Sequence, residues 1–300
     1  MILHGQQKRI LITGGSGFLG RQVAAQLSKV NDVVATYASH LVQLPRCRAV
    51  RMNFLQPFTI EQALKDFDPE VIVHIAALAD AAACEKTHDV ATAVNVTGTE
   101  LLMKALPNKD ALFLYISTDL VFDGDHAPYN EDAAPEPVSQ YGKTKRRAEQ
   151  IVQRMWKNHV ILRPALMFGK EQPAGRGSFL QWLDRAFQSP EPVTLFSDEV
   201  RTPVYAKDVV AAIHALVQNK GKHHIYHVGG PERITRAEFG KRLAALRGYD
   251  PAQICEKRLE EHHTGYPRPR DVSLHSNRIQ ESHFLRLTPI DDALREIFSL

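Results

Sequence analysis

The stretch TGGSGFLG at residues 13–20 constrains the fold more than any other feature of this sequence. It follows a short β-like run, RILIT, and precedes a helical pattern with apolar residues at four-residue spacing. Gly14, Gly17 and Gly20 are three residues apart, which permits a tight turn, close approach of the backbone to a pyrophosphate, and close packing of helix on strand. Because the stretch joins a strand to a helix, it predicts a dinucleotide-binding turn, and a plain glycine turn is the less favoured interpretation.

Short apolar runs alternate with helical patterns through the first two thirds of the chain. The runs that read as strands are residues 9–13, 32–37, 48–52, 71–78, 111–117 and 159–164. A helix is predicted over roughly 89–106, and YGKTK at 141–145 is considered as part of a helix. Strand–helix alternation at this spacing is typical of right-handed βαβ units, so it predicts an α/β fold with a doubly wound parallel sheet.

The alternation ends after Pro164, where a polar loop at 169–178 is followed by more widely spaced elements. Helical patterns near 179–188 and from Asp208, a strand-like run at 223–230 and a short C-terminal helix complete the chain. We therefore expect a Rossmann domain made of residues 1–165 and about 203–228, with a smaller lobe made of residues 166–202 and 229–300.

The composition excludes several classes of protein. The chain is 44% hydrophobic and 24% charged with a net charge of +3, and its basic residues are scattered, so nucleic acid is not an expected partner. The three cysteines are far apart, and neither they nor the histidine pairs have metal-ligand spacing, so no metal is expected. No apolar run is long enough for a signal peptide or a membrane span, and we expect a cytoplasmic protein with no membrane partner.

The end of the second predicted strand indicates which dinucleotide would bind. An acidic residue usually holds the ribose 2′-hydroxyl of NAD there, yet residues 33–48 contain no Asp or Glu. The region offers Ser39, His40, Arg46 and Arg48 instead. NADP(H) is therefore the preferred cofactor and NAD(H) a possible one, with Arg46 or Arg48 expected to bind the 2′-phosphate.

Tyr141 and Lys145 are four residues apart in YGKTK, so a helix would place them on one face. A tyrosine beside a lysine can be a proton donor next to a cation that lowers its pKa, or two amphipathic side chains on a solvated surface. The spacing by itself favours the second interpretation.

Five motifs that occur in order along the chain favour the catalytic interpretation of Tyr141 and Lys145. TGGSGFLG, NVTGT (95–99), STDLVFDG (117–124), YGKTK and RTPVYAKDVV (201–210) together resemble the extended short-chain dehydrogenase/reductase superfamily. Within it, STDLVFDG, YNEDAAPEPVSQYGKTK and RPRDVSLHSNRI (268–279) resemble the dTDP-4-dehydrorhamnose reductase family. A related branch is the regulatory β subunit of methionine adenosyltransferase.

The resemblance implies catalytic roles for Thr118, Tyr141 and Lys145. Tyr141 would protonate the carbonyl oxygen, Lys145 would hold the nicotinamide ribose and lower the tyrosine pKa, and Thr118 would hydrogen-bond the same oxygen. The residues expected at the cofactor are Gly14, Gly17, Phe18, Leu19, Gly20, Ser39, Arg46, Asn53, Phe54, Ala76, Ala77, Ser117, Tyr141, Lys145 and Arg163. The residues expected at a sugar-nucleotide substrate are Thr118, Asp119, Arg201 and Arg268.

Two departures from the family pattern concern the substrate. Alanines occupy 81–83, where the rhamnose-forming reductases tend to have polar residues, and Leu120 stands where the family commonly has tyrosine. We expect an NAD(P)H-dependent reductase of a nucleotide-linked 4-keto-6-deoxyhexose. The resemblance allows a homodimer. The alternatives are an epimerase or dehydratase of the same superfamily, and a non-catalytic NADP-binding regulatory subunit.

Overall fold

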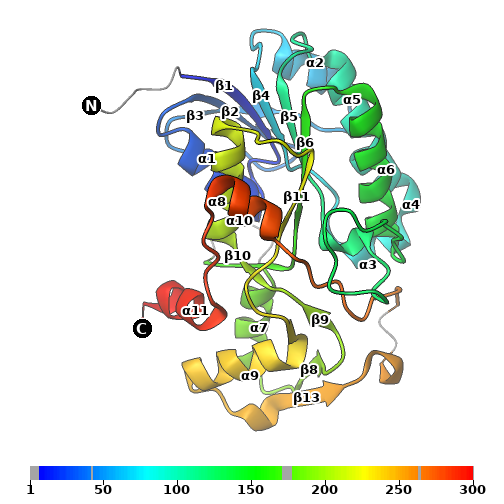
Figure 1. Cartoon of the computed structure of the whole chain (residues 1–300), viewed down its shortest axis with the longest axis vertical. Coiled ribbons are helices and arrows are strands. Elements are labelled where there is room, and N and C mark those ends of the chain that lie inside the picture. The colour runs from blue at the N-terminus through cyan, green and yellow to red at the C-terminus, as the bar shows by residue number, and fades with distance from the viewer. Residues whose placement is uncertain (1–6, 42, 171–177, 263–264, 300) are drawn as a thin grey trace.

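A seven-stranded parallel sheet forms the centre of the protein (Figure 1). The computed structural model describes residues 7–41, 43–170, 178–262 and 265–299. The strand order is β11-β6-β5-β4-β1-β2-β3, and every neighbouring pair is parallel. In chain order the strands are β1 (Arg9–Thr13), β2 (Asp32–Tyr37), β3 (Cys47–Arg51), β4 (Val71–His74), β5 (Leu112–Ile116), β6 (His159–Pro164) and β11 (Ile225–Val228). The predicted doubly wound α/β fold is confirmed.

Helices cover both faces of the sheet. They are α1 (Phe18–Leu27), α2 (Phe58–Leu64), α3 (Ala81–Lys86), α4 (His88–Thr92), α5 (Gly98–Ala105), α6 (Gln140–Met155), α8 (Ala206–Gln218) and α10 (Asn277–His283). Ile10 and Ile12 of β1 pack with α1 and α8, whereas Leu11 packs with α2, α5 and α6. Burial on both faces explains why the central strands read as continuous apolar runs.

A smaller set of elements packs below the sheet in Figure 1. It contains β7 (Met167–Phe168), β8 (Val193–Phe196), β9 (Val200–Arg201), β10 (Val204–Tyr205), β12 (Ile234–Thr235), β13 (Ile254–Lys257), α7 (Phe179–Phe187), α9 (Arg236–Arg247) and α11 (Ile290–Phe298). Its strands form three two-stranded pairs, β10–β7, β12–β9 and β13–β8. Phe168, Leu183, Leu195, Phe239 and Leu294 belong to a hydrophobic core of its own. Most of the predicted polar loop at 169–178 lies outside the described residues.

The order in which the chain adds strands to the sheet reverses between β1 and β4. Chain order runs outward from β1 through β2 to β3, and from β4 through β5 and β6 on the other side. At such a point the helices after the two strands leave toward opposite faces, which opens a crevice at the carboxyl ends of the strands. The crevice faces the smaller set of elements, so a ligand placed there contacts both parts of the chain.

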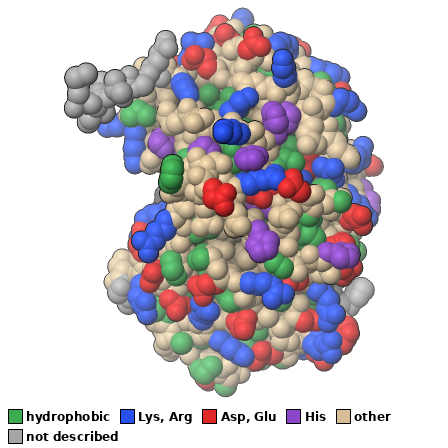
Figure 2. Space-filling view, viewed as in Figure 1, with side chains coloured by type: hydrophobic (Ala, Val, Ile, Leu, Met, Phe, Trp, Pro, Cys, Tyr) green, Lys and Arg blue, Asp and Glu red, His purple; other side chains and the backbone are tan. Residues whose placement is uncertain are grey.

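The surface carries mixed charge. On the described part of the face in Figure 2, Lys and Arg side chains alternate with Asp and Glu. Within the described ranges, none of the helices combines the length and the apolar character that crossing a bilayer requires.

Candidate active site

The glycine turn lies at the crevice between β1 and α1. Gly14 has φ of +71°, and a Cβ on it would lie 2.9 Å from the Ala76 backbone. A Cβ on Gly20 would lie 2.1 Å from the Gly14 carbonyl oxygen, so α1 packs directly on the turn. Gly17 caps α1 without a side chain, which leaves the N–H groups of the first helical turn available to an anion.

The first turn of α1 contains Phe18 and Leu19. Phe18 lines a cavity at the carboxyl ends of the strands, while the side chain of Leu19 is buried in the core. Phe18 is therefore available to a ligand through its ring, and Leu19 only through its backbone. This turn fits the pyrophosphate of a dinucleotide, and the roles of its residues stay predictions.

A buried chain of hydrogen bonds fixes the carboxyl ends of β1 and β4. His74 Nδ1 is 2.7 Å from Thr13 Oγ1, and its Nε2 is 2.9 Å from Thr99 Oγ1. Thr13 Oγ1 also accepts from the backbone N–H groups of Ile75 and Ala76, each at 3.1 Å. These contacts hold Ala76, and Ala77 after it, against the glycine turn, where small side chains leave room for a dinucleotide.

Asn95 holds the next part of the same edge. Its side chain accepts from Leu78 N at 2.7 Å and donates to the Leu78 carbonyl and to Thr144 Oγ1. It lies in a π-helical turn, Ala93–Thr97, between α4 and α5. Such turns occur frequently at functional sites. Asn95 therefore ties the segment after β4 to α6.

The side chains expected around the adenosine are not all at the crevice. Arg46 lies before β3, at the opposite edge of the sheet from the glycine turn, because β3 runs parallel to β2. Phe54 is buried with its ring 5.5 Å from His74, so it is a core residue. Asn53 Oδ1 accepts from Leu55 N, and Ser39 is exposed at the end of β2. The structure thus separates Arg46 from the site because the β2–β3 loop returns to the amino edge.

Helix α6 brings Tyr141 and Lys145 to the carboxyl end of β5. Ser139 caps the helix by accepting from Gly142 N at 3.2 Å. A Cβ on Gly142 would lie 2.1 Å from the Leu120 carbonyl oxygen. The glycine inside YGKTK therefore allows α6 to pack directly on the turn after β5, and the side chains of Tyr141 and Lys145 are both buried.

Thr118 and Asp119 form that turn, directly after Ser117. Thr118 donates to Asp119 Oδ1 at 3.0 Å, and both residues line the same cavity as Tyr141. Asp119 is 4% exposed, and its Oδ2 has no hydrogen-bond partner among the described residues. Burial raises the pKa of Asp119, and Arg201 opposes the rise. Asp119 can therefore accept a hydrogen bond from a ligand hydroxyl.

Burial is the largest cause of the pKa shifts of Tyr141 and Lys145. It raises the pKa of Tyr141 well above the ordinary value, and Asp119 and Cys84 add to the rise. It lowers the pKa of Lys145 to about 7, against the carboxylate of Glu149. Lys145 Nζ donates to the Ile116 carbonyl at 2.6 Å and lies 4.1 Å from the centre of the Tyr115 ring. Lys145 is not among the groups that shift the pKa of Tyr141 here, so the expected lowering of that pKa by Lys145 stays a prediction.

Arg163 does not present its side chain to the crevice. Its Nε and Nη2 each contact one carboxylate oxygen of Glu149 at 2.8 Å, and Nη1 is 3.3 Å from His227. Arg163 is 1% exposed, so the expected contact of its side chain with a cofactor is corrected to a structural ion pair with α6. Arg163 lowers the pKa of Glu149, although burial opposes this.

Three arginines surround one buried carboxylate beyond the tyrosine. Glu199 contacts Arg268 at 2.7 Å, Arg201 at 2.9 Å and Arg236 at 3.5 Å. Burial would raise the pKa of Glu199, but the three guanidinium groups lower it to about 2. The cluster keeps two positive charges in excess of the carboxylate it encloses, with Asp119 on its sheet side, and a diphosphate is a ligand of matching charge.

Two cavities meet at this cluster. The smaller, of about 330 Å³, is lined by Thr118, Asp119, Tyr141 and Arg201, and also by Ala81 and Leu120 where the sequence departs from the family pattern. The larger, of about 570 Å³, lies within the smaller set of elements. Both are lined by Glu199, Arg236, Tyr266 and Arg268, so they adjoin each other.

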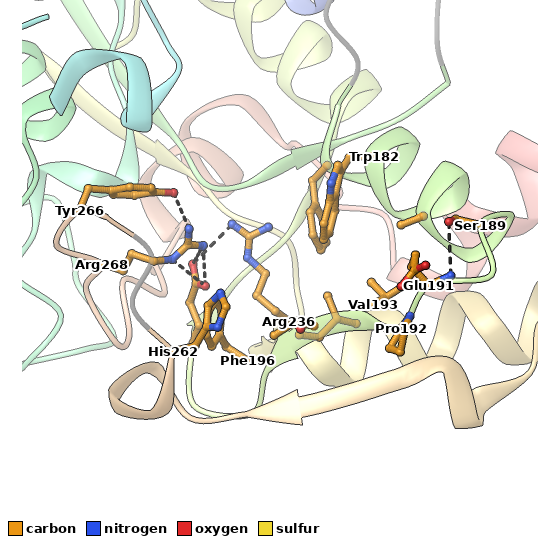
Figure 3. Close-up of a pocket in the computed structure, with 15 residues that line it drawn as sticks. Trp182, Ser189, Glu191, Pro192, Val193, Phe196, Arg236, His262, Tyr266 and Arg268 are labelled. Atoms are coloured by element: carbon orange, nitrogen blue, oxygen red, sulfur yellow. Dashed lines mark hydrogen bonds and ion pairs between the residues drawn. The ribbon is translucent and has the colours of Figure 1, made fainter. Parts of the chain in front are cut away.

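Aromatic rings form walls of the larger cavity (Figure 3). The ring of Phe196 lies 5.9 Å from that of His262, and Trp182 stands on the other side, stacked on Phe179. Arg236 lies 4.2 Å from the centre of the Phe179 ring. Such walls suit a flat ring system next to the arginine cluster.

Arg236, Tyr266 and the aromatic walls are functional candidates that sequence reasoning missed. Arg236 is the first residue of α9, and the capping box of Thr235 and Glu238 fixes where that helix begins. The capping box was visible in the sequence, but the direction of Arg236 depends on how α9 packs on β8 and β13. The other aromatic residues lie in segments without a recognisable motif.

Comparison with known proteins agrees with the fold. Residues 8–299 match the family described as the RmlD substrate binding domain. The methionine adenosyltransferase 2 subunit beta of Xenopus laevis is 29% identical over 96% of this chain and 86% of its own length. The probable low-salt glycan biosynthesis reductase Agl14 of Haloferax volcanii is 27% identical over 90% of each chain.

A solved structure extends this to three dimensions. The dTDP-4-dehydrorhamnose reductase of Bacillus anthracis, in complex with NADP, superposes with a TM-score of 0.85 over 98% of this chain and 99% of its own, at 24% identity. At this identity the likeness concerns the fold alone.

Proposed function

Since the chain belongs to the RmlD substrate binding domain family, we propose that it is an NADP(H)-dependent reductase of a nucleotide-linked 4-keto-6-deoxyhexose, similar to dTDP-4-dehydrorhamnose reductase. The observation that carries this proposal is the meeting of Thr118 and Tyr141 with the arginine cluster in one cavity. Two hydroxyl groups and an arginine cluster that line the same cavity would suit a ketone carried on a nucleotide diphosphate. Residues 1–165 and about 203–228 would bind the cofactor, and residues 166–202 and 229–300 the sugar nucleotide.

The protein's own groups would handle the proton. Tyr141 would give its hydroxyl proton to the C4 carbonyl oxygen. Burial raises the pKa of Tyr141 and so opposes this transfer, which a nearby positive charge would have to offset. Thr118 would donate to the same oxygen and fix its position. A nicotinamide cofactor, when bound, would supply the hydride that C4 receives. Lys145 would hold the nicotinamide ribose and, because it is a cation, favour the tyrosinate that remains after proton transfer.

The arginine cluster would bind the rest of the substrate. Arg201, Arg236 and Arg268 would contact the diphosphate, with Glu199 holding their guanidinium groups in place before the substrate arrives. The base would enter the larger cavity between Trp182 and Phe196. A hydroxyl next to the ketone would donate to Asp119 Oδ2, the carboxylate oxygen without a partner.

A regulatory NADP-binding subunit is the second candidate. The observation that favours it is the 29% identity to a methionine adenosyltransferase 2 subunit beta over almost the whole chain. Leu120 and Ala81 in the smaller cavity favour it too, because they replace polar groups next to the expected sugar. An epimerase or dehydratase is less favoured, since Leu120 gives Asp119 no acidic neighbour.

Loss of NADPH absorbance with dTDP-4-keto-6-deoxyglucose, or with its 3,5-epimerised form, tests the reductase. Tyr141→Phe should lower turnover by about 10²–10⁴-fold with little change in NADPH affinity, the usual effect of losing a general acid. Tyr226→Phe is the matched control, because Tyr226 is buried at the far edge of the sheet on β11. Equal turnover of wild type and Tyr141→Phe would refute the role of Tyr141. NADPH binding without turnover of either sugar would favour the regulatory subunit, which capture of a methionine adenosyltransferase catalytic subunit would then test.

A further inference from the structure

The carboxyl end of β2 carries a cation that belongs to the neighbouring strand. In the parallel pairing of β2 with β3, Tyr37 lies opposite Arg51. Arg51 is therefore at the same sheet edge as the glycine turn. Arg48 pairs with Val34, three residues nearer the opposite edge, and its guanidinium lies 4.0 Å from Asp32 and over the Phe67 ring.

Arg51 is held over the loop that follows β2. Its Nε donates to the Ala38 carbonyl at 3.4 Å, and its Nη2 donates to Gln56 Oε1 at 2.8 Å. Both partners are neutral, and residues 33–60 contain no Asp or Glu. The side chain is exposed, and none of its ion-pair distances to a described carboxylate is within 4.0 Å. Arg51 therefore holds a positive charge, with no described carboxylate paired to it, at the loop after β2.

The loop that Arg51 contacts lies beside the glycine turn. Gly15 N donates to the Thr36 carbonyl at 2.7 Å, so the turn lies against the end of β2. Ala38, Ser39 and His40 follow that end and are exposed, with Ser39 Oγ 2.9 Å from His40 Nδ1. The Arg51 guanidinium therefore lies at an exposed segment next to the turn.

We propose that Arg51 binds the 2′-phosphate on the adenosine ribose of NADP(H) and sets the preference for NADP(H) over NAD(H). A nicotinamide dinucleotide with its pyrophosphate on α1 carries its adenosine ribose to the end of β2. A guanidinium group there matches a phosphate in charge and in hydrogen-bond geometry. The ribose 2′-hydroxyl of NAD(H) meets no carboxylate on this segment. The inference rests on the proposed function only in taking the ligand to be such a dinucleotide.

Binding measurements test the assignment without any sugar substrate. Dissociation constants are measured by calorimetry for NADPH and NADH, and for 2′,5′-ADP and 5′-AMP, which differ only in the 2′-phosphate. Arg51→Ala should weaken NADPH and 2′,5′-ADP by about tenfold to a hundredfold, as expected for losing a charge-assisted contact. Its NADH and 5′-AMP affinities should stay near those of the wild type, and Arg51→Lys should fall between.

Arg48→Ala is the matched control, an exposed arginine on the same strand at the other edge, and it should bind all four ligands like the wild type. Four results would overturn the assignment. They are equal affinity of the wild type for NADPH and NADH, equal weakening of both by Arg51→Ala, no effect of Arg51→Ala, and loss of NADPH preference in Arg48→Ala. Failure of the reductase proposal is separate, since the preference can be present in a protein that turns over no sugar.

Discussion

Removing the Glu149 carboxylate should destabilise the protein strongly. Glu149 is 0% and Arg163 is 1% exposed at the side chain, and two parallel contacts of 2.8 Å join them. Glu149→Gln keeps the shape but leaves the Arg163 guanidinium buried without its counter-charge. Breaking a buried pair from one side costs about 3–5 kcal/mol, against a total stability of about 5–15 kcal/mol for a typical native protein.

Urea denaturation measures this directly. Trp156, buried at the end of α6, reports unfolding by its fluorescence. Glu100→Gln is the control, because Glu100 forms an exposed pair with Lys104 at 2.7 Å and such pairs contribute about 0–1 kcal/mol. The double variant Glu149→Leu/Arg163→Met should recover much of the loss, because it leaves no unpaired charge.

The same variant should also affect the proposed chemistry. Glu149 opposes the lowering of the Lys145 pKa by burial, so Glu149→Gln should move the ionisation of Lys145 to lower pH. Any turnover should show this as a shifted pH profile. A stability loss below about 1 kcal/mol, the range of exposed pairs, would refute the claim that Glu149 and Arg163 depend on each other.

Two further predictions concern pH and the glycine turn. Burial lowers the pKa of His74 to about 3 and holds that of His227 well below its ordinary value, so stability should fall as pH drops below the unfolded value of about 6.5. At pH 5.5 each of these two histidines should lower the free energy of unfolding by about 1.4 kcal/mol relative to pH 7.5, or about 3 kcal/mol together, because only the unfolded chain binds their protons. Urea midpoints at the two pH values check this, and equal stabilities would contradict it. Gly20→Ala should lose about 1–3 kcal/mol in urea denaturation, because its Cβ would lie 2.1 Å from the Gly14 oxygen. Gly17→Ala meets only that oxygen at 3.3 Å, so it should stay folded yet bind NADPH more weakly, and the reverse pattern would refute the roles given to the two glycines.

Local patterns were enough to predict the fold and the glycine turn. The helix over roughly 89–106 is interrupted, since α4 passes through a π-helical turn into α5. Thr288, just before the last helix, binds the carboxylate of Asp208 on α8 through its N–H and hydroxyl, a contact that no local pattern indicated. Tyr141 and Lys145 could be selected by spacing and resemblance because one turn of α6 carries both.

Residues whose role depends on pairing between distant elements could not be predicted. Arg46 and Arg51 are both arginines after β2, and only the register of β3 against β2 decides which lies at the crevice. Arg163 seemed available until Glu149, fourteen residues earlier on α6, was found to bind it. Arg236 required the packing of α9 on the smaller core.

The adjoining cavities give the site the property of a bivalent receptor. If a sugar occupies the smaller cavity and a base the larger, the diphosphate between them is a short tether across Glu199 and the arginines. Each half then raises the effective concentration of the other, so neither a free sugar nor a free base should bind well by itself. Selection would therefore act on the length of the ligand as much as on its chemistry.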